Sequence, residues 1–221
     1  MAFLDIKFDL DLSTTEVDGK RHYLTPEGTT YPSMTTVLSN YNKEGLQQWR
    51  DRVGEKEATR IMNQAAAQGT SVHNLCEAYV LGKELPPANS FERARFNQVK
   101  PIIDNDIQNV YACETALYSD YLKVAGRTDV IGKFRGVNSI IDYKNSRKPK
   151  KMEWISNYWL QEAGYAVMWA ERTKSVELAP KQLVLIITVE HEEPQIFIQP
   201  VTPWVNKLKE YLSETYPAFK A

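Results

Sequence analysis

The chain has 221 residues and a net charge of −1, and charged residues occupy 25% of its positions. This profile is typical of a globular protein with one sizeable core, and it excludes a general polycation. No apolar run reaches the roughly 18 residues of a membrane span, and the first residues lack the pattern of a signal peptide. We therefore expect a cytoplasmic protein without a membrane partner.

The first half of the chain has the apolar periodicity of a small hairpin followed by helices. In order, we expect an edge strand at 3–12, a hairpin at 20–32, a short helix or extended segment at 33–39, and helices from residue 46 to 69, at 71–81 and at 91–109. Gly54 should break the first of these helices softly, and Gly69 should end it. Thr70 and Ser90 are expected to cap the next two helices.

The second half alternates between strands and helices. We expect a strand at 110–119, a β-hairpin at 126–151 with its connection at 134–138, a helix at 152–171, strands at 181–190 and 195–199, and a closing helix at 201–215. This order predicts an α/β (α+β) fold with a central mixed β-sheet flanked by helices. We expect one domain over 1–221, in which an N-terminal hairpin and helical part extends to about residue 109.

The predicted hairpin from Gly126 to Lys151 carries the residues on which the functional argument depends. Asp142 and Lys144 are two apart on one strand and share a face, and pairing of the strands brings Asp129 beside Asp142. Two carboxylates and the Tyr143 carbonyl suit a hard cation such as Mg²⁺. Lys144 could hold a water or offset charge on a phosphate during hydrolysis of a phosphodiester. The alternative is a charged surface hairpin.

Other polar residues interrupt apolar faces elsewhere. His73 lies on a predicted helix and either reaches the metal or a phosphate, or forms a surface pair with Glu77. Glu114 lies on an otherwise apolar strand face and is a candidate accessory metal ligand. Gln161 and Tyr165 are four apart on a buried helix, where their partner is either a DNA backbone or the protein's own main chain.

Basic residues concentrate around the hairpin. Between Lys123 and Lys151 nine basic residues stand against two acidic ones, and such a patch suits a polyanion. The alternative is again a solvated surface. Candidates for contact with DNA are Thr70, Arg127, Ser146, Arg147, Lys148, Lys150 and Lys151, with Trp49 as a candidate for stacking on a base.

Taken in chain order, four segments resemble the RecB-like branch of the PD-(D/E)xK nucleases. These segments are GTSVH (69–73), GRTD (126–129), DYK (142–144) and QEAGY (161–165). The branch shows a helical His, a G-x-x-D strand, a D/E-x-K strand and a Q-x-x-x-Y helix in this order. Residues 31–73 are similar to the group of mitochondrial genome maintenance exonucleases and related phage exonucleases. The resemblance covers about 31–170, and Thr128 replaces the Pro of the family's name.

The resemblance implies a restriction-endonuclease-like nuclease core with an N-terminal helical arch, past which single-stranded DNA threads. It implies that Asp129, Asp142 and His73 hold Mg²⁺ or Mn²⁺ and that Lys144 is the catalytic lysine. It also implies that Gln161 and Tyr165 position the DNA strand. The two cysteines form no CxxC pair, so no iron–sulfur cluster is expected. No P-loop is present, so a helicase, single-strand-binding or recombination partner would be a separate chain.

We therefore expect a Mg²⁺- or Mn²⁺-dependent DNA exonuclease that acts on single strands or frayed ends in replication, recombination or repair. A bacterial or phage-infected cytoplasm is the expected setting. The alternatives are a duplex end-resecting exonuclease, a structure-specific endonuclease, and a catalytically silent DNA-binding module, which should have lost an acid or the lysine. Asp142→Ala or Lys144→Ala is expected to abolish cleavage and leave the fold intact.

Overall fold

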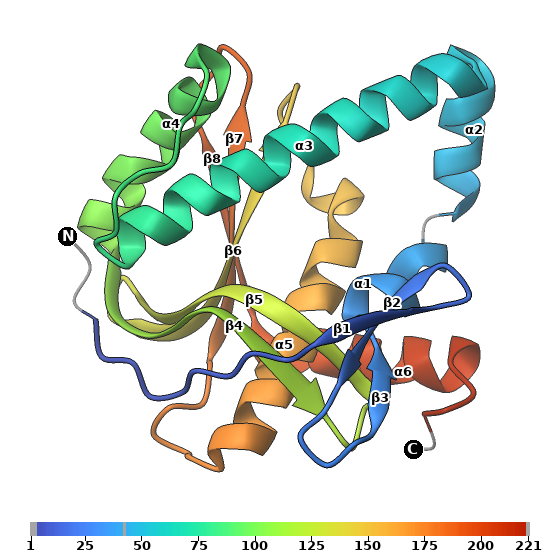
Figure 1. The fold of residues 1–221 in the computed structure, drawn as a ribbon, viewed down its shortest axis with the longest axis vertical. Helices are drawn as coiled ribbons and strands as arrows, with labels where there is room; N and C mark the ends of the chain where they lie inside the picture. Colours follow the sequence, from blue (N-terminus) through green and yellow to red (C-terminus); the bar gives the residue numbers. More distant parts are fainter. Residues whose placement is uncertain (1–3, 42, 220–221) are drawn as a thin grey trace.

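A mixed five-stranded sheet forms the centre of the computed structural model, which describes residues 4–41 and 43–219 (Figure 1). Its strands, in spatial order, are β4 (Ile107–Ser119), β5 (Val124–Phe134), β6 (Val137–Ser146), β7 (Gln182–Val189) and β8 (Gln195–Pro200). All neighbours are antiparallel except β6 and β7, which are parallel and are connected through helix α5 (Ser156–Thr173). The predicted α/β class with a mixed sheet flanked by helices is confirmed.

Helices cover both faces of this sheet. Helices α3 (Glu55–Val80) and α4 (Ser90–Asp106) pack on one face, where Phe134 and Ile103 are fully buried. Helices α5 and α6 (Val201–Thr215) pack on the other, around Trp159 and Trp169. Because β6 lies between these two cores, polar residues on it lie inside the protein. No helix in the described part of the chain is long and apolar enough to cross a membrane.

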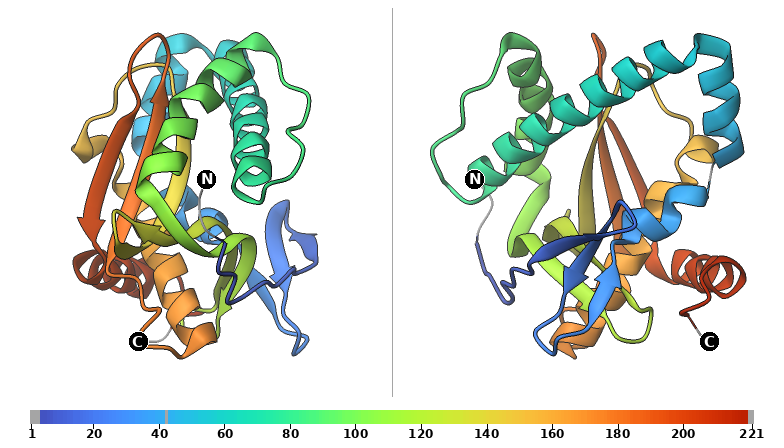
Figure 2. Two further views of the ribbon diagram at one scale, coloured as in Figure 1. Left: turned by 90° about the vertical axis from the view of Figure 1, so that its left-hand side faces the viewer. Right: turned by 45° about the vertical axis from the view of Figure 1, so that its right-hand side comes forward.

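The N-terminal part forms a small second sheet of β1 (Thr14–Val17), β2 (Lys20–Leu24) and β3 (Thr30–Pro32). It is followed by α1 (Met34–Val37) and the short 3₁₀ turn η1 (Leu38–Asn40). A bridge between Ser33 and Ala125 joins it to β5, and Tyr23 and Tyr31 pack against the ends of β4 and β5. The N-terminal sheet therefore lies beside the end of the central sheet at which a turn joins β4 to β5 (Figure 2).

We predicted an edge strand over residues 3–12. Phe3 lies outside the described residues, and for the rest of this range the prediction is wrong. Residues 5–13 form no regular strand, and the first one begins at Thr14. The segment follows β4 through hydrogen bonds from Asp5 N–H and Lys7 N–H to the carbonyls of Val110 and Tyr111 (2.9 and 2.8 Å). A third bond runs from the Ala116 N–H to the Leu10 carbonyl (2.9 Å), and the backbone of β4 is irregular near Asn109, whose φ is 45°.

The helices begin and end at residues that differ in part from those predicted. Gly54, with a φ of 86°, separates α2 (Lys43–Val53) from α3 as expected. Gly69 does not end a helix, because α3 continues unbroken through it for 26 residues (Figure 1). Thr70 is therefore no cap, and its hydroxyl donates to the Ala66 carbonyl (3.1 Å). Asn89, rather than Ser90, caps α4 in a reciprocal pair with Glu92.

Helix α3 can continue because Ala-rich flanks compensate for a single helical glycine, whose penalty is about 1 kcal/mol. Its length matters for the site. The helix crosses the sheet obliquely and packs over β4 and β6 (Figures 1 and 2). A short 3₁₀ turn, η2 (Met152–Trp154), follows the basic tail of β6 and leads into α5. One continuous helix thus spans the region where the predicted site residues lie.

Candidate metal centre

Three acidic residues lie at the same level of three neighbouring strands. The pairs Cys113–Val130 and Thr115–Thr128 place Glu114 of β4 opposite Asp129 of β5. Pairing of β5 with β6 ends at Val130–Ile141, so Asp142 follows at the level of Asp129. The Asp129 carboxylate replaces the next ladder bond, because its Oδ2 accepts the N–H of Tyr143 (2.8 Å). The two strands separate here, and the opening holds the site.

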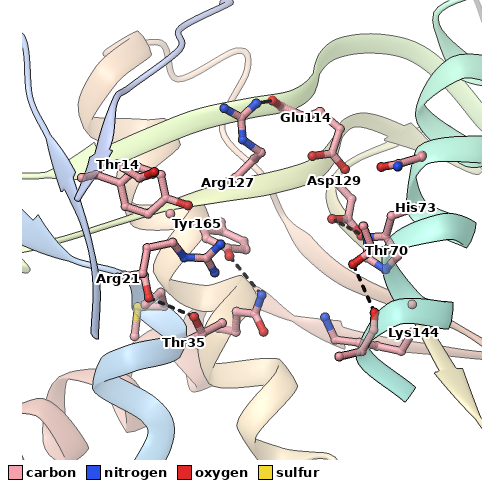
Figure 3. Close-up of a pocket in the computed structure, with 18 residues that line it drawn as sticks. Thr14, Arg21, Thr35, Thr70, His73, Glu114, Arg127, Asp129, Lys144 and Tyr165 are labelled. Carbon is pink, nitrogen blue, oxygen red and sulfur yellow. Dashed lines mark hydrogen bonds and ion pairs between the residues drawn. The ribbon is translucent and has the colours of Figure 1, made fainter. Parts of the chain in front are cut away.

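Helix α3 adds an imidazole to this opening. His73 Nδ1 lies 3.3 Å from Asp129 Oδ1, and the His73 ring packs edge-on against Tyr143 with centroids 6.2 Å apart. One ligand atom each from His73, Glu114 and Asp129 lies within 4.8 Å of the others (Figure 3). Two carboxylates and an imidazole so close together form a donor set that suits a divalent cation.

Burial and charge set the protonation of these three groups. Burial alone would lower the pKa of His73, but Coulomb attraction to Asp129 and the hydrogen bond that His73 donates to Asp129 outweigh it and raise this pKa to about 9. Burial also opposes ionisation of Asp129, yet His73 holds the pKa of Asp129 below its usual value. Burial, followed by repulsion from Asp129, raises the pKa of Glu114 to about 8. At neutral pH the cluster therefore holds a protonated His73, an ionised Asp129 and a neutral Glu114.

Asp142 and Lys144 form a buried ion pair next to this cluster. The Lys144 ammonium contacts Asp142 Oδ2 and lies 5.2 Å from the centre of the Tyr158 ring. Burial raises the pKa of Asp142 to about 6, whereas attraction to Asp142 outweighs burial and raises the pKa of Lys144. Both groups are thus charged at neutral pH. Asp142 is not one of the three clustered ligand residues, and the contact of Tyr143 with Asp129 is made by its N–H and not by its carbonyl. Metal binding by Asp142 and by the Tyr143 carbonyl therefore stays a prediction.

Glu162 of α5 is a polar residue that the sequence analysis did not single out. It is fully buried, no described side chain hydrogen-bonds to its carboxylate oxygens, and the Val184 backbone is a polar neighbour of this group. Burial, and then repulsion from Asp142, raises the pKa of Glu162 well above its usual value. Only the first and last residues of the QEAGY segment, Gln161 and Tyr165, were predicted to be functional. Nothing in the local sequence indicates that Glu162 is buried near an ion pair.

The two other residues of that segment contact each other. Gln161 Nε2 donates to the Tyr165 hydroxyl (3.0 Å), so the protein itself partners this pair. The Tyr165 ring also lies against Gly126 of β5. A Cβ at position 126 would come within 2.6 Å of Tyr165 Cε1. The glycine three residues before Asp129 therefore allows the Tyr165 ring to lie against the strand that carries the metal-site acid.

Gly126→Ala is expected to lower the free energy of unfolding by about 1–3 kcal/mol, because the added methyl overpacks the contact with Tyr165. The matched control is Gly69→Ala, since a Cβ there would meet only Asn145 Nδ2, at 3.9 Å. That substitution in a helix interior should raise the free energy of unfolding by about 0.5–1 kcal/mol. Urea denaturation of both variants measures the two effects, and equal stability of the two would contradict the packing argument.

A cavity of about 670 Å³ opens onto the metal centre (Figure 3). Of the residues predicted to contact DNA, Thr70, Arg127, Gln161 and Tyr165 line it, together with His73, Asp129 and Lys144. Arg127 is held there by contacts with Asp11 and the Glu114 carbonyl. Arg21 of β2 also lines the cavity and forms no ion pair with a described residue. Arg21 was not among the predicted site residues, because a single arginine in a hairpin does not indicate a binding site in the sequence.

The remaining predicted contacts lie elsewhere. Ser146, Arg147 and Lys150 line a second cavity of about 180 Å³. Lys148 lines neither of these two cavities, and its N–H and carbonyl both contact the Ser146 hydroxyl. Lys151 lies over the exposed ring of Trp154, with its Nζ 5.2 Å from the ring centre. Trp49 is a half-buried residue of α2, outside both cavities.

Comparison with known proteins gives two curated relatives. The chain is 27% identical over 131 residues to mitochondrial genome maintenance exonuclease 1 of Mus musculus, a match that covers 55% of this chain. It is 26% identical over 130 residues to the Homo sapiens protein of the same name, which covers 54% of this chain. The chain is a distant homologue of these exonucleases. The resemblance read from the motifs is thereby confirmed, although the match covers only 38% of the length of each exonuclease.

Other comparisons are weaker. No family model matches the chain. The crystal structure of the protein SSO0001 aligns over 80% of this chain and 82% of its own, with a TM-score of 0.37 and 13% identity. That of a candidate exonuclease from Eubacterium rectale aligns over 67% of this chain and 63% of its own, with a TM-score of 0.40 and 16% identity.

Proposed function

We propose that this chain is a metal-dependent deoxyribonuclease that acts as an exonuclease on single-stranded DNA or frayed ends, in replication, recombination or repair. The observation that carries the proposal is the convergence of His73, Asp129 and Glu114 beside Lys144 in one cavity. Homology to the mitochondrial genome maintenance exonucleases supports a nucleic-acid substrate. A silent DNA-binding module would not be expected to retain the acids and the lysine together.

The donor set fits Mg²⁺ or Mn²⁺. His73, Glu114 and Asp129 would hold the ion, with Asp142 as a further candidate ligand. Such an ion polarises a phosphate and lowers the pKa of water in its coordination sphere. Because His73 brings a nitrogen ligand to an otherwise oxygen-based site, we expect Mn²⁺ to bind more tightly than Mg²⁺.

Lys144 has a separate task in this mechanism. Asp142 keeps it protonated, so it acts as a hydrogen-bond donor and not as a base. Its ammonium would orient the attacking water or stabilise negative charge that develops on the phosphate oxygens. Its burial strengthens this effect, since the side chain is only 19% exposed and water screens it weakly.

The walls of the cavity would position the DNA strand. Arg21 forms no ion pair with a described acid and lines the cavity, so it is available for a phosphate. Gln161 and Tyr165 bond to each other and retain further donor and acceptor capacity toward the cavity that they line. Backbone contacts of this kind carry no sequence information, and we therefore expect cleavage with little sequence preference.

The test of the proposed function is cleavage of DNA labelled at either its 5′ or its 3′ end, as linear and circular single strands and as blunt duplex. We expect release of short products from linear single strands with Mg²⁺ or Mn²⁺, and none with EDTA. Cleavage of circular strands would indicate an endonuclease, and preference for blunt duplex would indicate a resecting enzyme. The Lys144→Met variant, purified in parallel, controls for a contaminating nuclease. No metal-dependent cleavage of any substrate would refute the proposal.

Metal binding is expected to release protons. At pH 7 His73 and Glu114 hold protons that both must lose to become ligands, because their pKa values are about 9 and about 8. Metal affinity should therefore rise with pH up to about 9. In the metal-free protein both pKa values exceed the ordinary 6.5 and 4.5, so the stability they confer is present at low pH and is lost as pH rises through 8 and 9.

Calorimetric titration with Mn²⁺ in buffers of different ionisation enthalpy measures this release. We expect between one and two protons per ion at pH 7, and a number that approaches zero above pH 9. His73→Ala should lower the number at pH 7 by about one. Release that is independent of both pH and His73 would contradict the assigned protonation states.

A further inference from the structure

The second cavity lies on the opposite side of helix α3 from the metal centre. Gln64 and Gln68 line it from α3, whereas Gly69, Thr70 and His73 of the same helix line the larger cavity. Arg95 of α4 and the end of β6 complete its wall. Asn145 follows Lys144 directly in β6, and alternation along the strand directs these two side chains to different cavities. The two cavities are therefore separate but adjacent.

Arg95 is the unusual residue of this cavity. It is only 3% exposed, yet its Nη1 has no hydrogen-bond partner among the described residues. Its nearest acid is Glu190, whose Oε2 lies 3.7 Å from Nη2, beyond hydrogen-bonding distance. Burial lowers the pKa of Arg95, and attraction to Glu190 offsets this only in part. A buried guanidinium with an unused donor destabilises a protein unless a ligand compensates for it.

Further donors meet Arg95 at the same cavity. Asn145 Nδ2 is buried without a partner, while its Oδ1 accepts a hydrogen bond from Thr188 (2.6 Å), which fixes the amide. Arg147 and Lys150 also line the cavity and form no ion pair with a described residue. Gln195 holds the Lys150 backbone through two hydrogen bonds, of 2.6 and 3.0 Å, so this part of the loop is anchored. None of the described residues that line the cavity is acidic.

We propose that this cavity binds one phosphate group, supplied by the DNA strand whose scissile bond lies at the metal centre. Three cations and a fixed amide donor can neutralise the negative charge of a phosphate and donate hydrogen bonds to its unesterified oxygens. The cavity, of about 180 Å³, has room for a phosphate group.

The two cavities meet where α3 comes close to β6. A Cβ added to Gly69, which lines the larger cavity, would lie 3.9 Å from Asn145 Nδ2, which belongs to the smaller one. One strand can thus present a phosphate to each side of this contact. Assigning the phosphate to a DNA strand rests on the proposed function, but the anion site itself does not. Free phosphate and a phosphate at a strand end share this chemistry, and the experiment separates them.

The test measures binding without cleavage. Inorganic phosphate is titrated by calorimetry into the protein in EDTA at constant ionic strength. Oligonucleotides with a 5′-phosphate, a 3′-phosphate or neither are then compared. We expect saturable binding of one phosphate and, for Arg147→Ala or Lys150→Ala, about tenfold weaker binding through loss of a charged hydrogen bond. Lys56→Ala, which removes an exposed charge of α3 outside both cavities, should bind phosphate as the wild type does.

Arg95→Met separates a binding role from a structural one. If Arg95 is held for a ligand, the apolar replacement should abolish phosphate binding and leave the thermal midpoint unchanged or higher. A preference for one phosphorylated end that disappears in Arg147→Ala identifies a terminal phosphate, and equal affinity of all oligonucleotides identifies an internal one. If free phosphate binds but does not compete with any oligonucleotide for the protein, the assignment of the site to a DNA phosphate would be overturned. Absence of saturable phosphate binding, or equal binding by the wild type and the Arg147 and Lys150 variants, would overturn the site.

Discussion

Lys144→Met is expected to slow cleavage of single-stranded DNA by about 10²–10³-fold, with DNA binding changed by no more than a few-fold. Removal of one donor that stabilises developing negative charge has an effect of this size in other hydrolases. Methionine retains the length of the side chain and removes only the ammonium group, and none of the three residues in the metal-site cluster is altered. Single-turnover rates with saturating Mg²⁺ report the chemical step, and binding in EDTA reports affinity.

The same substitution should also destabilise the fold, contrary to the expectation from the sequence. Lys144 and Asp142 are a buried pair, with side chains 19% and 4% exposed, and removal of one partner from such a pair lowers stability by about 3–5 kcal/mol. Without Lys144 the Asp142 carboxyl should take up a proton. A group whose pKa is raised on folding loses stability as pH rises, so the variant should be less stable at pH 8 than at pH 5.

Asp142→Asn/Lys144→Met is the matched control, because it removes both charges while keeping similar volumes. It should recover most of the lost stability and remain inactive, which separates chemistry from folding. Urea denaturation at the two pH values and the single-turnover rate test both parts. A Lys144→Met protein that cleaves DNA at the wild-type rate would remove Lys144 from the mechanism.

The sequence predicted the parts of the site that depend on local periodicity. Alternation along a strand correctly placed Asp142 and Lys144 on one face, and the turn at Arg135 and Gly136 set the hairpin that brings Asp129 to their level. The same rule did not describe β4. Positive φ values at Asn109 and Glu114 interrupt the alternation there, so counting faces could not show Glu114 opposite Asp129.

Contacts between distant segments were beyond a reading of the sequence. The clash that excludes a side chain at Gly126 involves Tyr165, and the burial of Arg95 depends on α4 packing beside β6 and α3. Gly69 was read as a helix end because glycine often follows a helix, but here it lies within α3 where the helix comes close to β6. In each case tertiary packing, and not the local sequence, determines the structural role of the residue.

Asp129→Asn is expected to weaken Mn²⁺ binding more than about 100-fold and to abolish cleavage, because it removes the central carboxylate of the cluster. Loss of residues that only support a metal ligand already weakens binding 10–100-fold, so loss of a ligand should exceed this. The substitution has a second consequence that needs neither metal nor DNA. Asp129 is the main cause of the raised pKa of His73, while burial of the ring lowers it. With an amide at position 129, the pKa of His73 should fall from about 9 to below its ordinary value of 6.5.

Proton NMR of the imidazole ring follows this change directly, since the chain has only three histidines. Glu114→Gln is the matched control. It removes another carboxylate of the same cluster and should weaken Mn²⁺ binding, but it leaves Asp129, the main cause of the raised pKa of His73, in place. The pKa of His73 should therefore fall less in Glu114→Gln than in Asp129→Asn. The two variants thus separate the carboxylate that chiefly holds the histidine proton, Asp129, from one whose main expected role is to bind metal, Glu114. A His73 that titrates at the same pH in both variants would show that the Asp129 contact does not control its charge.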